Sequence, residues 1–361
     1  MVKKALITGI TGQDGAYLSK FLLEKGYEVY GAFRGGGTTA LVNALNDEKL
    51  RFLGIENKIK FVPFELTDLT NIYRTIDLVE PDEIYNLGAQ TSARLGFEQP
   101  MFTADVNGLS VLRLLEAITS INPKIKFFQA SSSDMFGNPQ ALPQNESTPF
   151  SPTSISGTAK LFGHWTTVNY RKSYDIFACS GILFDHDSPL RNRQSVPGLI
   201  SNSVARIKMG LQDQLTLGSI ELSRDLGYAP EYVEAMWLML QQTKPDDYVI
   251  ATDETHPIRE FIKAAFESVD INIEWSGSGQ AEKGVDVRTG KTLVSLNLGF
   301  SSVNPSSAGA LVRGHTGVRI PLKGDYSKAR ELLGWEPKVR YKELFRIMVE
   351  YDQTLLTKKP L

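Results

Sequence analysis

The sequence predicts an α/β protein: a doubly wound parallel sheet of the Rossmann type, followed by a smaller C-terminal lobe. Two observations lead to this prediction. Short apolar stretches alternate with stretches of helical periodicity, and a glycine-rich turn joins the first strand to the first helix. The 361 residues, 42% hydrophobic and 22% charged, suffice for one large core or two fused cores, which excludes a disordered, collagen-like or coiled-coil chain.

The chain opens with a strand, a turn and a helix. Residues 4–8 are apolar and partly β-branched, and they lead directly into the glycine-rich residues 9–15. Apolar residues recur at helical spacing over residues 16–25, Gly26 provides the stop signal, and residues 28–33 form the next strand pattern. We therefore predict a βαβ unit at this end of the chain.

The glycines of the turn suit the binding of a dinucleotide. They allow a tight turn, a close approach of the backbone to a pyrophosphate, and close packing of the helix on the strand. The free amides at the start of the helix favour the phosphate charge. An ordinary strand-to-helix turn is the alternative, but the surrounding βαβ pattern favours dinucleotide binding. The turn residues expected to contact the cofactor are Gly9, Thr11, Gly12, Gln13, Asp14 and Gly15.

The residue at the end of the second strand bears on the choice of cofactor. An acidic residue there binds the ribose 2′-hydroxyl of NAD, whereas a basic residue accommodates the 2′-phosphate of NADP. The sequence has Arg34 at this position, followed by three glycines at 35–37. We therefore predict NADP rather than NAD, the alternative being that Arg34 is a solvated surface residue.

Further strand patterns follow, separated by helical ones. The strands are expected at residues 60–65, 83–87 and 126–130, and a helix between them at residues 102–121. Ligands of such sheets bind beyond the carboxyl ends of the strands, so the segments 88–94 and 131–136 are expected to line the site. The residues expected to contact the cofactor near these strand ends are Glu65, Leu66, Leu87 and Ala89.

Charge and cysteine content exclude several kinds of partner. Lys and Arg total 39 against 41 Asp and Glu, so no basic field is available to attract a nucleic acid. The only cysteine, Cys179, excludes an intramolecular disulfide and a multi-cysteine metal site, and we expect it to be an inert buried thiol in a reducing, cytoplasmic setting. No apolar stretch has the length of a signal sequence or a membrane span. His164 is expected to pack in the core, and no ligand spacing of the histidines indicates a metal site.

Several longer segments carry a resemblance to a known family. They are ALITGITGQDG at 5–15, PDEIYNL at 81–87, LRLLEA at 112–117, WTTVNY at 165–170, CSGILF at 179–184, SRD at 223–225, EAMWLMLQ at 234–241, DDYVIAT at 246–252 and LGWEP at 333–337. Through these segments nearly the whole chain resembles the GDP-mannose 4,6-dehydratase family, extended short-chain dehydrogenases that act on nucleotide sugars.

The resemblance implies an NADP-dependent, redox-neutral dehydration of GDP-mannose to GDP-4-keto-6-deoxymannose. Hydride leaves C4 of the sugar, water is eliminated across C5 and C6, and hydride returns to C6. Family members use a Ser/Thr-x-Glu segment and a Tyr-x-x-x-Lys pair, which here implies roles for Ser132, Asp134 and Lys160, the lysine also contacting the cofactor. A homo-oligomer, dimer or tetramer, is also implied, with the segment 34–49 meeting a neighbouring subunit.

The family's tyrosine is replaced by Ser156, four residues before Lys160. A serine hydroxyl is much less acidic than a phenol, so water relayed through Ser156, or the substrate's own hydroxyl, would have to serve. A homologue, natural or engineered, that binds a dinucleotide without dehydratase activity is therefore the alternative. A related epimerase or reductase is disfavoured, because most of those reactions also need the tyrosine.

Further departures concern the substrate side of the site. Asp134 stands where the family has glutamate, and Asp185 stands where it has asparagine. The resemblance implies that Arg191 and Arg224 contact the substrate together with Asp185, and that His186 lies near the cofactor. The family's Arg-Lys pair is missing at 196–199 and its Arg-Pro-x-Glu-Val-Asp segment has no clear counterpart, 303–309 being the nearest. Residues 310–323 form an apparent insertion containing Arg313, His315 and Arg319.

Two lobes are expected. Residues 1–184 form the NADP-binding Rossmann lobe, and residues 185–361 form mainly the substrate-binding lobe, with part of this segment returning to the sheet. The helical patterns of the second lobe lie at residues 196–209, 231–242 and 260–269. The nucleotide sugar is expected in the cleft between the lobes.

Overall fold

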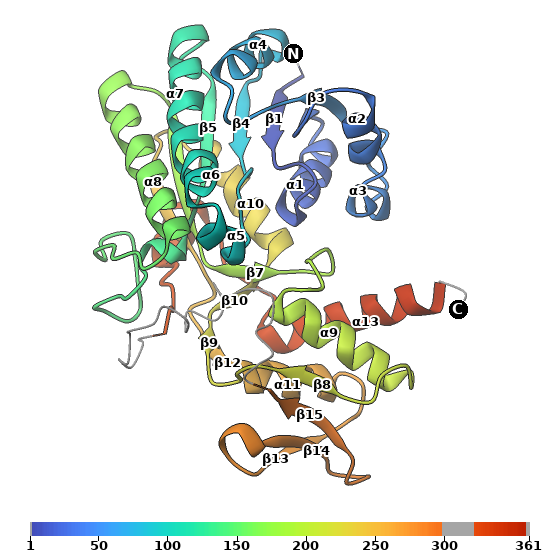
Figure 1. Cartoon of the computed structure of the whole chain (residues 1–361). Helices are drawn as coiled ribbons and strands as arrows, with labels where there is room; N and C mark the ends of the chain where they lie inside the picture. Colours follow the sequence, from blue (N-terminus) through green and yellow to red (C-terminus); the bar gives the residue numbers. More distant parts are fainter. Residues whose placement is uncertain (1, 298–320, 359–361) are drawn as a thin grey trace.

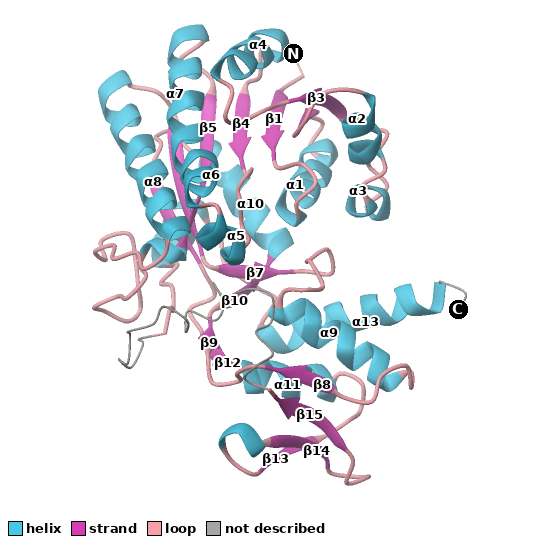
Figure 2. Ribbon diagram, viewed as in Figure 1, coloured by secondary structure: helices cyan, strands magenta, loops and turns pink. Residues whose placement is uncertain are grey.

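A computed structural model describes residues 2–297 and 321–358 and contains a large parallel sheet (Figures 1 and 2). The strand order is β11-β6-β5-β4-β1-β2-β3, and every neighbouring pair is parallel. The strands are β1 (Lys4–Thr8), β2 (Glu28–Phe33), β3 (Lys60–Pro63), β4 (Glu83–Asn86), β5 (Lys126–Ser132), β6 (Ala178–Leu183) and β11 (Asp247–Ile250). The predicted doubly wound sheet is confirmed.

Helices cover both faces of this sheet (Figure 2). Alternate residues of β1 point to opposite faces, so Ile7 joins one buried apolar cluster and Leu6 the other. The first face is covered by α1 (Gln13–Glu24), α2 (Thr38–Leu45), α3 (Glu48–Phe52), α10 (Ala229–Leu240) and α12 (Ser327–Leu333). The second is covered by α4 (Leu69–Val79), α7 (Ser110–Ile121) and α8 (Ile155–Tyr174), with α5 (Ala93–Glu98) and α6 (Pro100–Ala104) nearby.

The helix predicted at residues 102–121 is interrupted. A π-helical turn, Asp105–Leu109, separates α6 from α7. Within this turn the side chain of Asn107 is engaged with the backbone of Gln90: Gln90 N donates to Oδ1 over 2.8 Å and Nδ2 donates to Gln90 O over 2.9 Å. The apolar pattern continues through the turn, so hydrophobic periodicity could not reveal it.

Other boundaries differ by a few residues. Helix α1 begins at Gln13. The prediction began at residue 16 because the first turn is polar and lacks the apolar repeat on which the prediction was based. Strand β3 ends two residues earlier than predicted, at Pro63, and β5 continues two residues further, to Ser132. The longer β5 brings Ser132 to the carboxyl edge of the sheet.

The smaller lobe lies beyond that edge (Figure 1). Its four-stranded sheet has the order β13-β14-β15-β8 and consists of β13 (Ile273–Ser276), β14 (Lys283–Asp286), β15 (Thr292–Leu296) and β8 (Leu215–Leu217). Three helices share an apolar core with it: α9 (Val196–Lys208), α11 (Ile258–Glu267) and α13 (Tyr341–Lys358). The segment 303–309 and positions 310–320 of the expected insertion lie outside the described residues.

Two small strand pairs lie between the lobes. Strand β7 (Asp185–Asp187) pairs with β10 (Leu226–Tyr228), and β9 (Ser223–Arg224) pairs with β12 (His256–Pro257). The expected return to the sheet consists of β11 and α10. The helical pattern at 231–242 therefore belongs to the covering of the large sheet, where α10 packs on α1.

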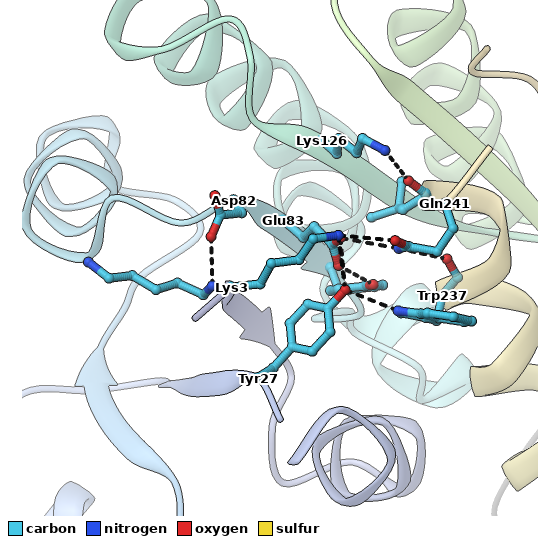
Figure 3. A network of polar contacts seen from close by, with 10 residues as sticks. Lys3, Tyr27, Asp82, Glu83, Lys126, Trp237 and Gln241 are labelled. Atoms are coloured by element: carbon cyan, nitrogen blue, oxygen red, sulfur yellow. Dashed lines mark hydrogen bonds and ion pairs between the residues drawn. The ribbon is translucent and has the colours of Figure 1, made fainter. Parts of the chain in front are cut away.

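A polar network fixes α10 to the amino edge of the large sheet (Figure 3). Glu83, at the start of β4, is 1% exposed and accepts hydrogen bonds from Tyr27 Oη, Lys3 Nζ and Gln241 Nε2, each over 3.1 Å. Trp237 Nε1 donates to Tyr27 Oη over 3.1 Å. This network lies at the edge opposite the predicted site.

Candidate functional site

The glycine turn leaves no room for side chains on its inner side. Gly9 has φ +72°, and a Cβ there would come within 2.9 Å of Gly88 N. A Cβ on Gly15 would lie 2.4 Å from Gly9 O, and one on Gly12 would lie 3.1 Å from the same oxygen. The first turn of α1 is thereby held close to the ends of β1 and β4.

A cavity of about 510 Å³ opens over this turn. We call it the glycine-turn cavity. It is lined by eight predicted cofactor residues: Gly9, Thr11, Gly12, Gln13, Asp14, Gly15, Leu87 and Ala89. The remaining lining residues are Lys49, Thr91, Ser92, Leu190, Arg191, Asn192, Gln194 and Ser195.

Lys49 was missed at the sequence level. It lies in α3, lines the glycine-turn cavity, and donates from Nζ to Thr11 O over 2.8 Å. A basic residue beside the glycine turn suits an anionic ligand. A lone surface lysine in a charged helical segment gives no signal in the sequence that could reveal this contact.

A second cavity of about 210 Å³ adjoins the first. We call it the Ser156 cavity. Thr91, Ser92, Arg191 and Ser195 line both cavities. Seven predicted catalytic and substrate residues line it: Ser132, Asp134, Ser156, Lys160, Asp185, Arg191 and Arg224. The other lining residues are Gln90, Thr91, Ser92, Asp187, Ser195, Val196, Pro197, Leu226, Ile258 and Phe261.

Ser156 and Lys160 come from one face of α8. Ser154 caps this helix, its Oγ accepting from Gly157 N over 3.0 Å. Lys160 is 9% exposed and donates from Nζ to Ala130 O over 2.6 Å. Burial lowers the pKa of Lys160 to about 8, although the charges of Asp134 and Asp14 oppose the shift. Asn107 Nδ2 donates to Ser156 Oγ over 3.3 Å, a contact that the sequence did not reveal.

Asp134 projects from the short 3₁₀ turn Ser133–Met135 that follows β5. Ser132 Oγ caps this turn by accepting from Asp134 N over 3.1 Å. Burial raises the pKa of Asp134, and the charge of Asp185 raises it further, while Arg224 and Lys160 lower it. The carboxyl group is therefore more easily protonated than an exposed aspartate.

The two arginines of the Ser156 cavity each have a carboxylate partner. Arg191 Nε lies 2.8 Å from Asp187 Oδ1, and an Arg224 guanidinium nitrogen lies 3.5 Å from Asp185 Oδ2. Burial raises the pKa of Asp187, and Arg191 opposes that shift. The negative charge of Asp185 is thus partly compensated by Arg224.

Four predicted cofactor residues line neither cavity. Arg34 is exposed at the end of β2. Glu65 accepts a hydrogen bond from Thr67 Oγ1 over 3.1 Å, and Leu66 packs against Gly88. His186 lies behind the turn, where its Nε2 is 3.0 Å from Asp14 Oδ2. Burial alone would lower the pKa of His186, but Asp14 raises it.

Two other predicted residues are core residues. His164 is 3% exposed and its Nδ1 lies 2.7 Å from Ser180 Oγ, as expected for packing with one hydrogen bond. Cys179 is fully buried, and burial raises the pKa of its thiol to about 12.

Within residues 2–297 and 321–358, no cluster of three or more His, Cys, Asp or Glu side chains could hold a metal ion. In the same ranges no helix combines the length and apolar character needed to cross a membrane.

Solved structures of similar fold belong to nucleotide-sugar enzymes. UDP-glucose 4-epimerase from Thermotoga maritima, solved with UDP-glucose, superposes with a TM-score of 0.76 at 20% identity and covers 98% of this chain and 99% of that chain. dTDP-glucose 4,6-dehydratase from Bacillus anthracis, in complex with NAD, has a TM-score of 0.74 at 16% identity, covering 99% of this chain and 98% of that chain. At these identities the likeness shows the fold.

The sequence comparisons are closer. GDP-mannose 4,6 dehydratase from Cricetulus griseus is 44% identical over 361 residues, covering 99% of this chain and 93% of the relative. The human protein of that name is 43% identical over 359 residues, with the same coverage. A family model described as GDP-mannose 4,6 dehydratase matches residues 6–348. The chain belongs to the GDP-mannose 4,6-dehydratase family.

Proposed function

We propose that the protein is a lyase that converts GDP-mannose to GDP-4-keto-6-deoxymannose with NADP as cofactor. The observation that carries the proposal is the junction of the two cavities, which places the glycine turn at one end and Asp134, Ser156 and Lys160 at the other. Family membership supports the substrate, because the relatives named above are GDP-mannose 4,6-dehydratases.

The residues of the glycine-turn cavity fit a nicotinamide dinucleotide. The cradle between Gly9 and Gly15 would be filled by any Cβ, and the start of α1 faces it. When bound, such a cofactor accepts hydride from C4 of the sugar and returns it to C6. Arg34 and Lys49 would hold the additional phosphate of NADP, although related folds have been solved with either NAD or NADPH.

The polar residues of the Ser156 cavity have distinct roles in this proposal. Arg191 and Arg224 bind the pyrophosphate of the nucleotide sugar, exchanging part of their contact with Asp187 and Asp185 for the ligand. Asp134 removes the C5 proton and protonates the leaving C6 hydroxyl, a role supported by its raised pKa. Ser132 donates a hydrogen bond to the sugar.

The presence of Ser156, where the family has tyrosine, favours a second candidate function. A protein that binds the dinucleotide without dehydrating GDP-mannose would also retain the glycine-turn cavity. Incubation of the purified protein with NADP and GDP-mannose, with detection of the 4-keto-6-deoxy product, decides between the two. Product in many turnovers supports the dehydratase, whereas tight NADP binding without product, in both the wild type and Ser156→Tyr, supports the second candidate.

A homo-oligomer is part of the proposal. Large apolar side chains are exposed on α6, the π-helical turn and α8: Met101 (82%), Leu109 (43%), Phe162 (45%) and Trp165 (54%). A second copy of the chain is the partner that would cover such a surface. Light scattering coupled to gel filtration tests this.

We also propose a cytoplasmic location, for which the single buried cysteine is the support.

A further inference from the structure

We propose that, in this chain, the amine of Lys160 is the group that finally accepts the proton of the sugar C4 hydroxyl, with the hydroxyl of Ser156 as the relay. This inference rests on the proposed dehydration. It concerns the removal of the proton from the C4 hydroxyl, for which this chain lacks the family's tyrosine. The chain must supply another acceptor, and the Ser156 cavity contains the groups among which it can be found.

Most ionisable groups of the Ser156 cavity are unsuited to the task. Arginine does not lose its proton in proteins, which removes Arg191 and Arg224. Asp187 forms an ion pair with Arg191 over 2.8 Å, and Asp185 forms one with Arg224 over 3.5 Å. Asp134 and Lys160 are the two lining groups that keep the capacity to accept a proton.

Lys160 is the group left for this task, because Asp134 is assigned to the C5 proton. It follows Ser156 by four residues, which is one turn of α8 and about 6 Å along the helix axis. Both side chains line the same cavity. A single water molecule between the hydroxyl and the amine is enough to connect them, and a cavity of about 210 Å³ has room for it.

The surroundings of Lys160 favour a neutral amine. Its side chain is buried, and among the described residues no carboxylate lies within 4.0 Å of its Nζ. The ionisable groups facing it are Asp134 and Asp14, which act at longer range. Within the part of the chain that the structure describes, Lys160 makes one hydrogen bond, to Ala130 O; it uses an N–H and leaves the nitrogen lone pair of a neutral amine available. A buried amine without an ion-pair partner loses its proton more readily than an exposed one.

The hydroxyl of Ser156 is oriented for relay. Its Oγ accepts a hydrogen bond from Asn107 Nδ2, and Asn107 is itself fixed by two hydrogen bonds with the backbone of Gln90. Because one lone pair faces Asn107, the remaining lone pair and the O–H are left for the cavity. Ser156 can therefore accept the substrate proton while giving its own toward Lys160, without ever existing as an alkoxide.

The proton inventory of this scheme balances. The C4–H and O4–H bonds break and the C4=O double bond forms: the hydride goes to the oxidised nicotinamide dinucleotide and the proton to Lys160. In the elimination, the C5–H and C6–O bonds break and the C5=C6 double bond forms: Asp134 takes the C5 proton and gives it to the leaving hydroxyl, which departs as water. When hydride returns to C6, C5 needs one proton. The ammonium of Lys160 supplies it through Ser156 or solvent, so the amine is neutral again at the end of the cycle.

The first test measures Lys160 itself, without cofactor. The protein is labelled with ¹⁵Nζ-lysine and titrated by NMR, and the Lys160 signal is assigned from its absence in Lys160→Arg. We expect a midpoint of about 8, well below the ordinary lysine value of 10.5. A midpoint above about 10 overturns the proposal, because the amine would then be charged at the working pH.

The second test follows product formation from GDP-mannose between pH 6 and pH 10. The wild-type rate is expected to rise with the midpoint of Lys160, and Ser156→Ala to lower kcat by about 100-fold or more with little change in KM. Thr158→Ala, which removes an exposed hydroxyl from the same helix, is the matched control and is expected to leave the rate unchanged. Wild-type rates in Ser156→Ala, or a profile that follows an acidic midpoint typical of Asp134, contradict the relay.

Ser156→Tyr separates failure of this proposal from failure of the proposed function. In this variant the phenol accepts the proton, so the rate is expected to lose its dependence on the Lys160 midpoint. Product from the wild type at a rate that Ser156→Ala leaves unchanged overturns the relay and retains the dehydratase. Product from Ser156→Tyr but none from the wild type at any pH overturns the relay and the proposed activity of the wild type, and shows that the rest of the site is competent. No product from either protein overturns the proposed function and this inference with it.

Discussion

Asn107 donates a hydrogen bond from Nδ2 to Ser156 Oγ over 3.3 Å, which couples the π-helical turn to the start of α8. Asn107→Ala removes this bond and both contacts with the backbone of Gln90. We expect a loss of about 1–3 kcal/mol in the free energy of unfolding, because buried backbone groups are left unsatisfied, and a lower kcat. Urea denaturation measures the first effect; Asn43→Ala, at an exposed position of α2, is the control. Equal stability of the two variants would contradict the assignment.

The Glu83 network predicts a change in stability without a change in binding. Glu83→Gln removes the charge that accepts from Lys3, Tyr27 and Gln241 at the amino edge of the sheet. We expect the free energy of unfolding to fall by about 1–3 kcal/mol, because the hydrogen bonds to a charged acceptor are lost or weakened. The loss is not larger because the exposed Lys3 amine remains solvated.

The dissociation constant of NADP, measured by calorimetry, should stay unchanged in Glu83→Gln because the cavities lie at the other edge. Glu24→Gln, in an exposed ion pair with Lys20, is the matched control and should change stability by less than about 0.5 kcal/mol. Weaker NADP binding in Glu83→Gln alone would show that the two edges are coupled.

Gly15→Ala is expected to weaken dinucleotide binding. The new Cβ would lie 2.4 Å from Gly9 O, so either α1 or the turn must shift. Overpacking of about 1–3 kcal/mol corresponds to a dissociation constant raised by roughly tenfold to 100-fold. Gly36→Ala, where nothing lies within 4 Å of an added Cβ, is the control. Unchanged fluorescence titrations with NADPH in Gly15→Ala would rule out pyrophosphate binding at this turn.

Arg34 is expected to distinguish the two nicotinamide cofactors. Its exposed side chain follows β2, so Arg34→Ala should raise the dissociation constant of NADP by about tenfold or more and leave that of NAD unchanged. Arg51→Ala, an exposed arginine of α3, should change neither. Parallel loss of both cofactors, or of neither, would argue against a phosphate contact.

Lys160 predicts how stability depends on pH. Burial lowers its pKa from 10.5 to about 8, so between these values the unfolded chain binds more protons than the folded protein. This group therefore makes the free energy of unfolding rise with pH across that interval, by roughly 2 kcal/mol, and adds no slope below it. Lys160→Met should flatten the rise, whereas Lys20→Met should not. Chemical denaturation at pH 7.5 and pH 10 gives one slope for each protein, and identical slopes in the wild type and both variants would contradict the lowered pKa.

The sequence predicted the parts of the molecule that local patterns encode. Alternating apolar segments and the glycine turn led to the parallel sheet. The family resemblance singled out Ser132, Asp134, Ser156 and Lys160, and the fold brings these four residues to one cavity. What local patterns do not encode was missed. Lys49 and Asn107 reach the site from distant elements through single polar contacts, and neither contact leaves a periodic signal.

Long-range pairing explains the remaining differences. The helical pattern at 231–242 has the same character whether it packs on the smaller lobe or on the large sheet, and its burial against α1 is decided by tertiary contacts. The ion pair of Asp185 with Arg224 depends on the pairing of short strands. Such pairings depend on the whole fold rather than on their neighbours in sequence.

The late return of α10 and β11 has a consequence for synthesis on the ribosome. When the first 184 residues have emerged, β6 is an open edge strand and one side of the sheet lacks its α10 cover. These missing pieces are translated only with residues 229–250. A nascent chain of this length therefore carries an unpaired edge and bare apolar surface, the features that recruit chaperones and promote aggregation. Fragments truncated near residue 184 should be insoluble by themselves, and co-expression of the missing segment is the rational way to rescue them.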